Sequence, residues 1–358
     1  MKEAVVEAQL LRSHSSKVAI VLVNWRGWRD TIECLESVFR LDADNYRVIV
    51  CDNASGDDSL DRIESWAQGF LASEPQIHEL RGLSTPPVAK PIATVRLSES
   101  DLRINQVNSE APLVLIEAAE NRGFAAGCNI GIRYAFADST CEFIWLLNND
   151  TVVDEGALKS LIKLMEDDRM EMCGSVCLFY HNPNEVQALG GLNYSRWTGR
   201  VKVQQKLMWN MINPHAAPEP TDYIVGASWF FRRSVFERIG LLDESYFLYY
   251  EEIDFASRLG KHGRWSYSLQ SLVYHKAGAS AGSARDRMAR SAISELYLTR
   301  GRVIVCRRYF PWCIPSTIVA ILFAVLHRLL RGRFSIAGVM LKGLKEGLTM
   351  RLTPPPRL

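Results

Sequence analysis

The sequence predicts an α/β protein with a mostly parallel central sheet and helices on both faces. Continuous apolar runs bounded by polar residues are typical of parallel strands that are buried on both sides. Four such runs occur in the first 150 residues: VAIVLVN (18–24), YRVIVCDN (46–53), LVLIEAA (113–119) and CEFIWLL (141–147). A helical segment follows each run, and this alternation favours right-handed crossovers within one sheet.

Each helix after a predicted strand has its own signal. The first begins near Asp30 as a cap and places Ile32, Leu35, Val38 and Phe39 on one face. The others cover 59–70, 125–137 and 155–167, and the second of these is rich in small residues.

The domain organisation follows from where this alternation stops. We expect an N-terminal extension over 1–16, a main domain over 17–284 and a basic, apolar, helical region over 285–358. Within the main domain, 71–112 contains several prolines and little periodicity, which predicts a surface insertion. From residue 171 onward the pattern predicts antiparallel strands, with one short helix over 249–263, so the domain divides into 17–170 and 171–284.

Charge is unevenly distributed along the chain. The formal net charge is +2, but residues 285–358 carry 14 Lys+Arg and 3 Asp+Glu, which leaves 28 basic and 37 acidic residues in 1–284. The segment WCIPSTIVAILFAVL (312–326) has no charge, and at 15 residues it is shorter than the roughly 20 that a straight membrane span needs. Flanking arginines indicate an amphipathic helix on an anionic membrane surface, the alternative being a helix packed on the main domain. So much aliphatic area disfavours a nucleic-acid surface.

The N-terminus and the cysteines indicate the compartment. Residues 1–17 contain no long apolar stretch, which disfavours a secretory signal. The eight cysteines form no CxxC pair and several fall within predicted core elements, so we expect free, buried thiols in a reducing cytoplasm.

Polar residues follow three of the predicted strands. In open parallel sheets, ligands bind beyond the carboxyl ends of the strands. The residues at these ends are Asn24, Asp52, Asn53, Asn148, Asn149 and Asp150. The turn after the first strand, NWRGWRD, has a single glycine, and Gly123, Gly127 and Gly131 are spaced four apart. Neither pattern matches a dinucleotide or a Walker loop, so NAD and ATP binding are disfavoured.

Two of these carboxylates are candidates for ligand binding. Asp150 lies at the end of an apolar strand. A hard divalent cation commonly bridges one or two carboxylates to substrate phosphates. Asp52 is suited to accept a hydrogen bond from a nucleobase imide or a ribose hydroxyl. The alternatives are structural, since NNDT also fits a helix cap and Asx residues also cap turns.

Acidic residues and a histidine in the second half are candidates for catalysis. Glu251, Glu252 and Asp254 follow the aromatic stretch YFLYY, and crowding of like charges in an apolar setting raises a carboxyl pKa toward the range of a general base. A solvated acidic helix start is the alternative. His275 ends an apolar strand, where it is structural unless it converges with Asp150.

Six motifs in order resemble family 2 glycosyltransferases of the GT-A fold, in the branch that includes bacterial rhamnosyltransferases. They span roughly residues 17–280 and are VAIVLVNWRGWRDTIECLESV, VIVCDNASGDDS, ENRGFAAGCNIGI, WLLNNDTVV, GASWFFRRSVFERIGLLDESYFLYYEEIDFASRL and VYHKAGAS. The resemblance implies a nucleotide-sugar-binding half over 17–170 and an acceptor half over 171–284. The insertion over 71–112 has no counterpart in this family pattern.

The resemblance also implies roles for particular residues. Asn24 would lie beside the nucleoside and Asp52 would pair with uracil or thymine. Asp150 and His275 would bind Mg²⁺ or Mn²⁺ on the diphosphate, and Glu252 would be the general base. The remaining implied donor-binding residues are Asn53, Arg122, Gly123, Asn129 and Asn149, and those on the acceptor side or in its support are Glu251, Asp254 and Trp229.

Two departures from the family pattern affect the implied chemistry. Asn148 replaces the first acid of the Asp-x-Asp motif, so the metal site loses one charged ligand. The usual base aspartate is Glu252, one methylene longer.

The implied function is an inverting, metal-dependent glycosyltransferase that moves L-rhamnose from a dTDP donor to a lipid-linked or polysaccharide acceptor. We expect it on the cytoplasmic face of the cell membrane, bound peripherally through its C-terminal region. Alternatives are a UDP-sugar donor (galactofuranose or a hexose) and an inactive glycan-binding membrane scaffold. A nucleotidyltransferase is disfavoured because no basic, Gly-rich phosphate loop follows the first strand.

Overall fold

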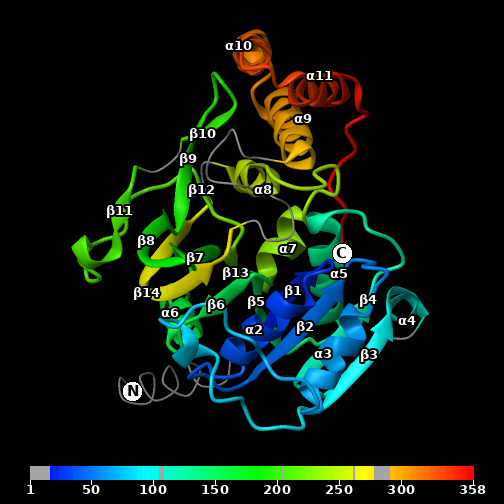
Figure 1. The fold of residues 1–358 in the computed structure, drawn as a ribbon, viewed down its shortest axis with the longest axis vertical. Coiled ribbons are helices and arrows are strands. Elements are labelled where there is room, and N and C mark those ends of the chain that lie inside the picture. Colours follow the sequence, from blue (N-terminus) through cyan, green and yellow to red (C-terminus); the bar gives the residue numbers. More distant parts are fainter. Residues whose placement is uncertain (1–16, 105–108, 203–204, 261–262, 278–290) are drawn as a thin grey trace.

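A mixed β-sheet runs through the centre of the protein, with helices on both faces (Figure 1). The structure is a computed structural model that describes residues 17–104, 109–202, 205–260, 263–277 and 291–358. Among these residues, 14 strands join one sheet, with the main order β10-β9-β8-β7-β13-β5-β1-β2-β4-β3. The predicted extension over 1–16 and the predicted boundary at 284–285 lie outside the described residues.

The first half of the chain builds the parallel part of the sheet. Strands β5, β1, β2, β4 and β3 are neighbours in this order, and each pair is parallel. The elements are β1 (Lys17–Asn24), α2 (Trp28–Val38), β2 (Tyr46–Asp52), α3 (Ser59–Ala67), η1 (Arg81–Leu83), β3 (Thr94–Ser98), α4 (Glu99–Ile104), β4 (Leu113–Glu117), α5 (Phe124–Phe136), β5 (Cys141–Asn148), β6 (Thr151–Val153) and α6 (Ala157–Leu164).

The second half adds antiparallel strands beyond β5. Strand β13 lies between β5 and β7 and is antiparallel to both. The elements are β7 (Met172–Phe179), β8 (Asn182–Leu189), β9 (Gly191–Ser195), β10 (Arg200–Lys202), β11 (Leu207–Met208), η2 (Trp209–Met211), β12 (Tyr223–Ile224), β13 (Ser228–Arg232), α7 (Arg233–Ile239), α8 (Glu251–Leu259) and β14 (Trp265–His275). Strand β14 pairs in parallel with β7 and antiparallel with β6.

Alternate side chains of the central strands enter two separate cores. In β1, Val18, Ile20 and Leu22 pack with α2, α3 and α6, while Val21 and Val23 pack with α5 and α7 on the other face. Burial on both faces explains why these strands are continuous apolar runs. The predicted α/β class with a mostly parallel sheet is confirmed.

The small residues of α5 allow a close approach to β1. A Cβ atom added at Gly131 would lie 2.4 Å from the Val21 Cγ1, and one at Gly127 would lie 2.8 Å from the Val23 Cγ1. The two glycines therefore allow α5 to pack closely on β1, and they are not part of a phosphate-binding loop.

The stretch over 71–112 differs from the surface insertion expected there. Its residues Thr94–Ser98 form β3, which pairs in parallel with β4 at the edge of the sheet. Strand β3 is half-exposed, so its sequence TVRLS lacks the continuous apolar signal of the inner strands.

The C-terminal region consists of α9 (Ala292–Tyr309), η4 (Pro311–Cys313), α10 (Ile314–Leu330) and α11 (Phe334–Thr349). Helix α9 is part of the main fold, because Ile304 and Val305 share a core with Tyr250 and Ile253. Helices α10 and α11 pack on α9 at one end of the molecule (Figure 1). Over the described residues, the stretch Pro311–Leu330 alone has the length and apolar composition to cross a membrane, and 28% of its most apolar window is buried in the protein. All eight cysteines are buried and unpaired, as expected.

Candidate active site

A buried carboxylate network occupies the carboxyl ends of β1 and β2. Asp52 Oδ1 accepts hydrogen bonds from Asn24 Nδ2 (2.6 Å) and Ser55 Oγ (2.6 Å), and Asp52 Oδ2 accepts one from the Ser55 backbone N–H (2.9 Å). Each carboxylate oxygen accepts about two hydrogen bonds, so Oδ2 retains capacity for one more donor. Asn24 and Asp52, which lie side by side in the β1–β2 register, are thus brought together as expected from their positions.

Asn53 joins this network to the loop before α5. Its Nδ2 donates to Asn121 Oδ1 (2.9 Å) and to the Gly123 carbonyl (3.0 Å), whereas its buried Oδ1 has no hydrogen-bond partner among the described residues. Gly123 has φ = 94°, and a Cβ there would lie 2.3 Å from the Phe247 carbonyl oxygen. The glycine is required both by its backbone conformation and by this contact.

Asp150 and His275 meet at the carboxyl ends of β5 and β14. The pairing of β14 with β6 places His275 opposite Thr151, and the His275 Nε2 atom lies 3.1 Å from Asp150 Oδ1. The Lys276 backbone N–H also donates to the Asp150 carbonyl (2.9 Å). Two candidate ligands that are 125 positions apart in the sequence thus converge at the end of the sheet.

The partners of His275 make its Nδ1 a donor. Gln187 Oε1 lies 2.9 Å from Nδ1 and accepts the Nδ1 proton, because an amide oxygen has no proton to donate. In the neutral imidazole the lone pair is then on Nε2, which lies 3.3 Å from Asn148 Nδ2. The neutral tautomer with a lone pair on Nε2 is the form that binds metal ions.

The arrangement fits a divalent cation. The Asn148 Oδ1 atom is buried and has no hydrogen-bond partner among the described residues. Asp150 Oδ1 and His275 Nε2, which lie 3.1 Å apart, would be the two side-chain ligands that hold the ion. Among the described residues no cluster contains three or more His, Cys, Asp or Glu side chains suited to a metal. The remaining positions would therefore fall to the Asn148 amide, to water and to ligand oxygens.

Asn149 connects the two halves of the site. Its Nδ2 donates to Thr31 Oγ1 (2.9 Å), and the Thr31 hydroxyl donates to Asn24 Oδ1 (2.9 Å). The side chains of Asn149, Thr31 and Asn24 therefore form a hydrogen-bonded chain from the segment that carries Asp150 to Asp52.

Glu251 and Glu252 begin α8 directly after two residues in left-handed conformation, Tyr249 and Tyr250 (φ 67° and 73°). Burial raises the pKa of Glu252 above its usual value. Burial raises the pKa of Glu251 well above its usual value, and the negative charge of Glu252 raises it further. A raised carboxyl pKa lies closer to the range in which a general base works.

One loop lies between Glu252 and the segment that carries Asp150. The Gly226 N–H donates to Glu252 Oε1 (3.4 Å), and the carbonyl of the next residue, Ala227, accepts from the Asn148 N–H (3.1 Å). The side chain of Glu252 and the backbone of Asn148 thus lie on either side of a single dipeptide between β12 and β13. The Gly226–Ala227 dipeptide thus links the segment that carries Glu252 to the strand end that precedes Asp150.

Replacing Gly226 tests whether the position of Glu252 matters. A Cβ there would lie 2.9 Å from Glu252 Oε1 and must displace that carboxylate. We expect Gly226→Ala to lower turnover about a hundredfold, with an unchanged melting temperature. Gly82→Ala is the control, because a Cβ at Gly82 meets no atom within 4 Å. Wild-type turnover by Gly226→Ala would show that the reaction tolerates displacement of this carboxylate.

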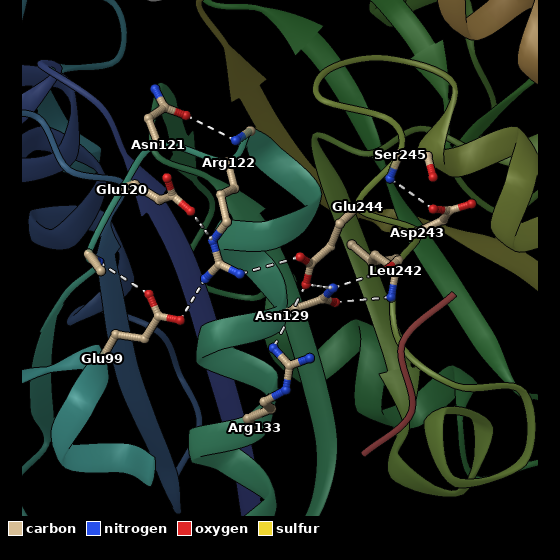
Figure 2. Close-up of polar contacts among 12 residues, drawn as sticks. Glu99, Glu120, Asn121, Arg122, Asn129, Arg133, Leu242, Asp243, Glu244 and Ser245 are labelled. Atoms are coloured by element: carbon tan, nitrogen blue, oxygen red, sulfur yellow. Dashed lines mark hydrogen bonds and ion pairs between the residues drawn. The ribbon is translucent and has the colours of Figure 1, made fainter. Parts of the chain in front are cut away.

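Arg122 and Asn129 make polar contacts with α4 and with the loop before α8 (Figure 2). Arg122 lies among Glu99 (2.6 Å), Glu244 (3.5 Å) and Glu120 (3.9 Å). Asn129 donates to the Leu242 carbonyl (2.9 Å) and to Glu244 Oε1 (2.9 Å), and it accepts from the Leu242 N–H (3.0 Å). Both N–H donors of Asn129 are used in these contacts, which fix the loop before α8 against α5.

Two further residues predicted from the sequence, Trp229 and Asp254, are buried in the protein beneath the site. Trp229 is fully buried, and its indole N–H donates to the Ile224 carbonyl (2.8 Å). Asp254 is also fully buried and accepts hydrogen bonds from Arg258 (2.8 Å) and Tyr309 (2.7 Å). Neither side chain is accessible to an acceptor.

Three contributors to the site were not identified from the sequence. Gln187 reaches His275 from the antiparallel strand β8, and no local pattern marks that contact. Thr31 lies within α2, where it looks like an ordinary helix residue. Ser55 had a usable signal, because a hydroxyl three residues after an Asx residue is typical of a capped turn.

Part of the chain is similar in sequence to known glycosyltransferases. The family model "Glycosyl transferase family 2" matches residues 102–240. The chain is 28% identical over 173 residues to the low-salt glycan biosynthesis hexosyltransferase Agl10 of Haloferax volcanii, covering 48% of this chain and 53% of that protein. It is 35% identical over 72 residues to the N-acetylglucosaminyl-diphospho-decaprenol L-rhamnosyltransferase of Mycobacterium tuberculosis, covering 20% of this chain and 24% of that protein. The matches thus span about half or less of these relatives.

Solved structures show the same fold. The mannosyltransferase PcManGT from Pyrobaculum calidifontis, in complex with GDP-Man and Mn²⁺, superposes with a TM-score of 0.51 at 14% identity, covering 98% of this chain and 97% of that chain. GalNAc-T7 with UDP, GalNAc and Mn²⁺ superposes with a TM-score of 0.54 at 13% identity, covering 83% of this chain and 49% of that chain.

These findings confirm the resemblance predicted from the six motifs. Residues 102–240 match the glycosyl transferase family 2 model, and the chain has the α/β fold of the two solved glycosyltransferases.

Proposed function

We propose that this protein is an inverting, metal-dependent glycosyltransferase that transfers L-rhamnose from dTDP-rhamnose to a lipid-linked acceptor in the synthesis of a cell-surface glycan. The observation that carries the proposal is the 3.1 Å approach of His275 Nε2 to Asp150 Oδ1, joined to Glu252 through the Gly226–Ala227 loop. A diphosphate held by Asp150 and His275 would present its sugar toward Glu252.

The roles of the chain's residues follow from their contacts. Asp150 and His275, with the Asn148 amide nearby, would hold Mg²⁺ or Mn²⁺, and such an ion stabilises the charge that develops on a nucleoside diphosphate as it leaves. Gln187 keeps the His275 proton on Nδ1. Glu252 takes the proton of the acceptor hydroxyl as that oxygen attacks the anomeric carbon from the face opposite the leaving group. This single displacement inverts the anomeric centre and needs no covalent enzyme intermediate.

The donor is inferred from the Asp52 network and from the relatives. Asn24 and Ser55 orient the carboxylate of Asp52 by their hydrogen bonds. Its Oδ2 can accept one more hydrogen bond, which suits the imide N–H of thymine or uracil. The match to an L-rhamnosyltransferase favours a dTDP-sugar. A UDP-hexose or UDP-galactofuranose is the second candidate, supported by the match to a hexosyltransferase.

The acceptor and the location are inferred together. The rhamnosyltransferase relative is named for a diphospho-decaprenol substrate, which favours a lipid-linked acceptor here. The exposed, apolar α10 supports peripheral attachment to the cytoplasmic face of the membrane.

A screen of nucleotide sugars by thermal shift, with and without Mn²⁺, tests the proposed function. We expect dTDP-rhamnose with Mn²⁺ to give the largest rise in melting temperature, because a ligand at a hundred times its Kd stabilises the fold by about 2.7 kcal/mol. A larger rise with a UDP-sugar would select the second candidate. Equal behaviour of all nucleotide sugars, with no effect of Mn²⁺, would contradict the proposal.

A further inference from the structure

Helix α10 presents an apolar stripe to solvent. Most of its large exposed apolar side chains recur at the three- and four-residue intervals of one helix face. They are Val319, Leu322, Phe323, Leu326, Leu329 and Leu330. Phe323 is 69% exposed and Leu330 is 78% exposed. So large an exposed apolar face marks an interaction surface rather than ordinary solvent contact.

The opposite stripe of α10 packs on the protein. Ile321 and Val325 share a small core with Val303 of α9 and Met340 of α11. Arg328 on the same side forms a buried ion pair with Glu295 of α9 (2.5 Å). A helix fixed to the protein along one side is not surrounded by lipid, so α10 is placed to lie along a membrane surface rather than to cross it.

The charge around this stripe is positive. Arg331, Arg333 and Lys345 make no ion pair with any described residue. Over 311–358 the chain has 7 Lys+Arg and 1 Asp+Glu. An apolar face bordered by unpaired cations is complementary to a bilayer that contains anionic lipid.

The hairpin between β9 and β10 extends this surface. Its turn is bound to α10, since Ser316 Oγ donates to the Trp197 carbonyl (2.6 Å) and Arg200 donates to the Ala320 carbonyl (3.4 Å). Trp197 at the turn and Trp312 before α10 are each 66% exposed. Figure 1 shows this hairpin reaching the same end of the molecule as α10. Exposed tryptophans beside an apolar helix are typical of the membrane–water interface.

The same hairpin contacts the turn that precedes the catalytic acids. The Tyr250 hydroxyl donates to the Gly199 carbonyl (2.8 Å), and Tyr250 immediately precedes Glu251 and Glu252. On the α9 side, Arg302 Nε donates to the Thr198 carbonyl (2.6 Å). One turn of the hairpin therefore touches both the C-terminal helices and the base-bearing segment.

We propose that the β9–β10 hairpin and α10 form one docking surface for an anionic phospholipid bilayer, with Trp197 and Trp312 inserted at the interface. The inference rests on the proposed function only for its purpose: a bilayer bound here would hold a lipid-linked acceptor on the side of the molecule where Tyr250 leads into Glu252.

Vesicle sedimentation with the full-length protein tests the surface without any donor or acceptor. We expect the wild type to sediment with vesicles of phosphatidylcholine mixed with phosphatidylglycerol, and far less with phosphatidylcholine alone. Trp197→Ala and Trp312→Ala should each weaken binding about tenfold, because each removes one large side chain from the interface. Phe70→Ala is the control, since Phe70 is 86% exposed and follows α3, a helix far from α10 in Figure 1.

Each other outcome overturns the inference. Unchanged sedimentation of Trp197→Ala would show that the hairpin is not part of the docking surface. Equal binding to both kinds of vesicle would show that anionic lipid is not required. A dimer of the lipid-free protein by light scattering, broken by Phe323→Asp, would assign the face to a second copy of the chain. The thermal shift with nucleotide sugars reports the proposed function separately, so a failure of one result leaves the other readable.

Discussion

Replacing Glu252 by Gln is expected to lower transfer by a factor of about 10²–10⁴, the usual contribution of a positioned general base. The amide has the size of the carboxylate but does not accept the proton of the acceptor hydroxyl. Because the donor would be held by Asp52, Asp150 and His275, the thermal shift with dTDP-rhamnose and Mn²⁺ should match that of the wild type. Initial rates at saturating donor and the thermal shift together measure both effects.

The pH dependence adds a second signature of Glu252. Burial raises the pKa of Glu252, and the reaction needs its ionised form, so the rate should rise with pH through that raised pKa. The Gln variant should show no such rise. A wild-type rate, or an unaltered pH profile, in Glu252→Gln would exclude this residue as the base.

Glu251→Gln is the matched control on the same helix turn. Burial and the charge of Glu252 raise the pKa of Glu251 well above its usual value, so Gln resembles the protonated form that this shift favours. We expect this variant to retain most of its activity. A carboxyl whose pKa is raised in the folded state contributes stability that is lost as pH rises through that pKa, so Glu251→Gln should also make unfolding less sensitive to alkaline pH. A loss of transfer as large as that of Glu252→Gln would reverse the two roles.

The parts of the fold that the sequence predicts are those in which local pattern and burial coincide. Strands β1, β2, β4 and β5 are continuous apolar runs because both of their faces enter a core. Strand β3 escaped prediction because an edge strand needs no such run. The insertion of β13 between β5 and β7 is a long-range pairing, and no local signal specifies it.

The same distinction applies to the site. Asp52 and Asp150 stand at strand ends, where the direction of the chain alone brings polar groups to one edge of the sheet. The contacts of Asn129 could not be predicted, because a buried amide beside a glycine-rich turn has the same local sequence whether it binds a ligand or a loop. Its partners, the backbone of Leu242 and the carboxylate of Glu244, are more than 110 positions away. Gln187 was missed for the same reason.

Replacing Asp150 by Asn is expected to lower transfer about a thousandfold, equivalent to about 4 kcal/mol of transition-state stabilisation. The change keeps the shape of the side chain and removes the only carboxylate within ion-pair distance of His275 Nε2 among the described residues. Binding of Mn²⁺ in the presence of dTDP, followed by electron paramagnetic resonance, should weaken in parallel. Loss of binding and of transfer together would assign the defect to the ion rather than to the fold.

Two neighbouring substitutions make the metal assignment specific. Asn148→Asp adds a carboxylate beside Asp150 and should keep or strengthen Mn²⁺ binding, because a charged ligand replaces a neutral one. Gln187→Leu removes the acceptor that keeps the His275 proton on Nδ1, and should weaken Mn²⁺ binding about tenfold to a hundredfold. If Asp150→Asn left Mn²⁺ binding intact while transfer fell, the carboxylate would act in another way and the site would have to hold its cation elsewhere. If all three variants bound Mn²⁺ as the wild type does, the convergence of Asp150 and His275 would be a structural contact rather than a metal site.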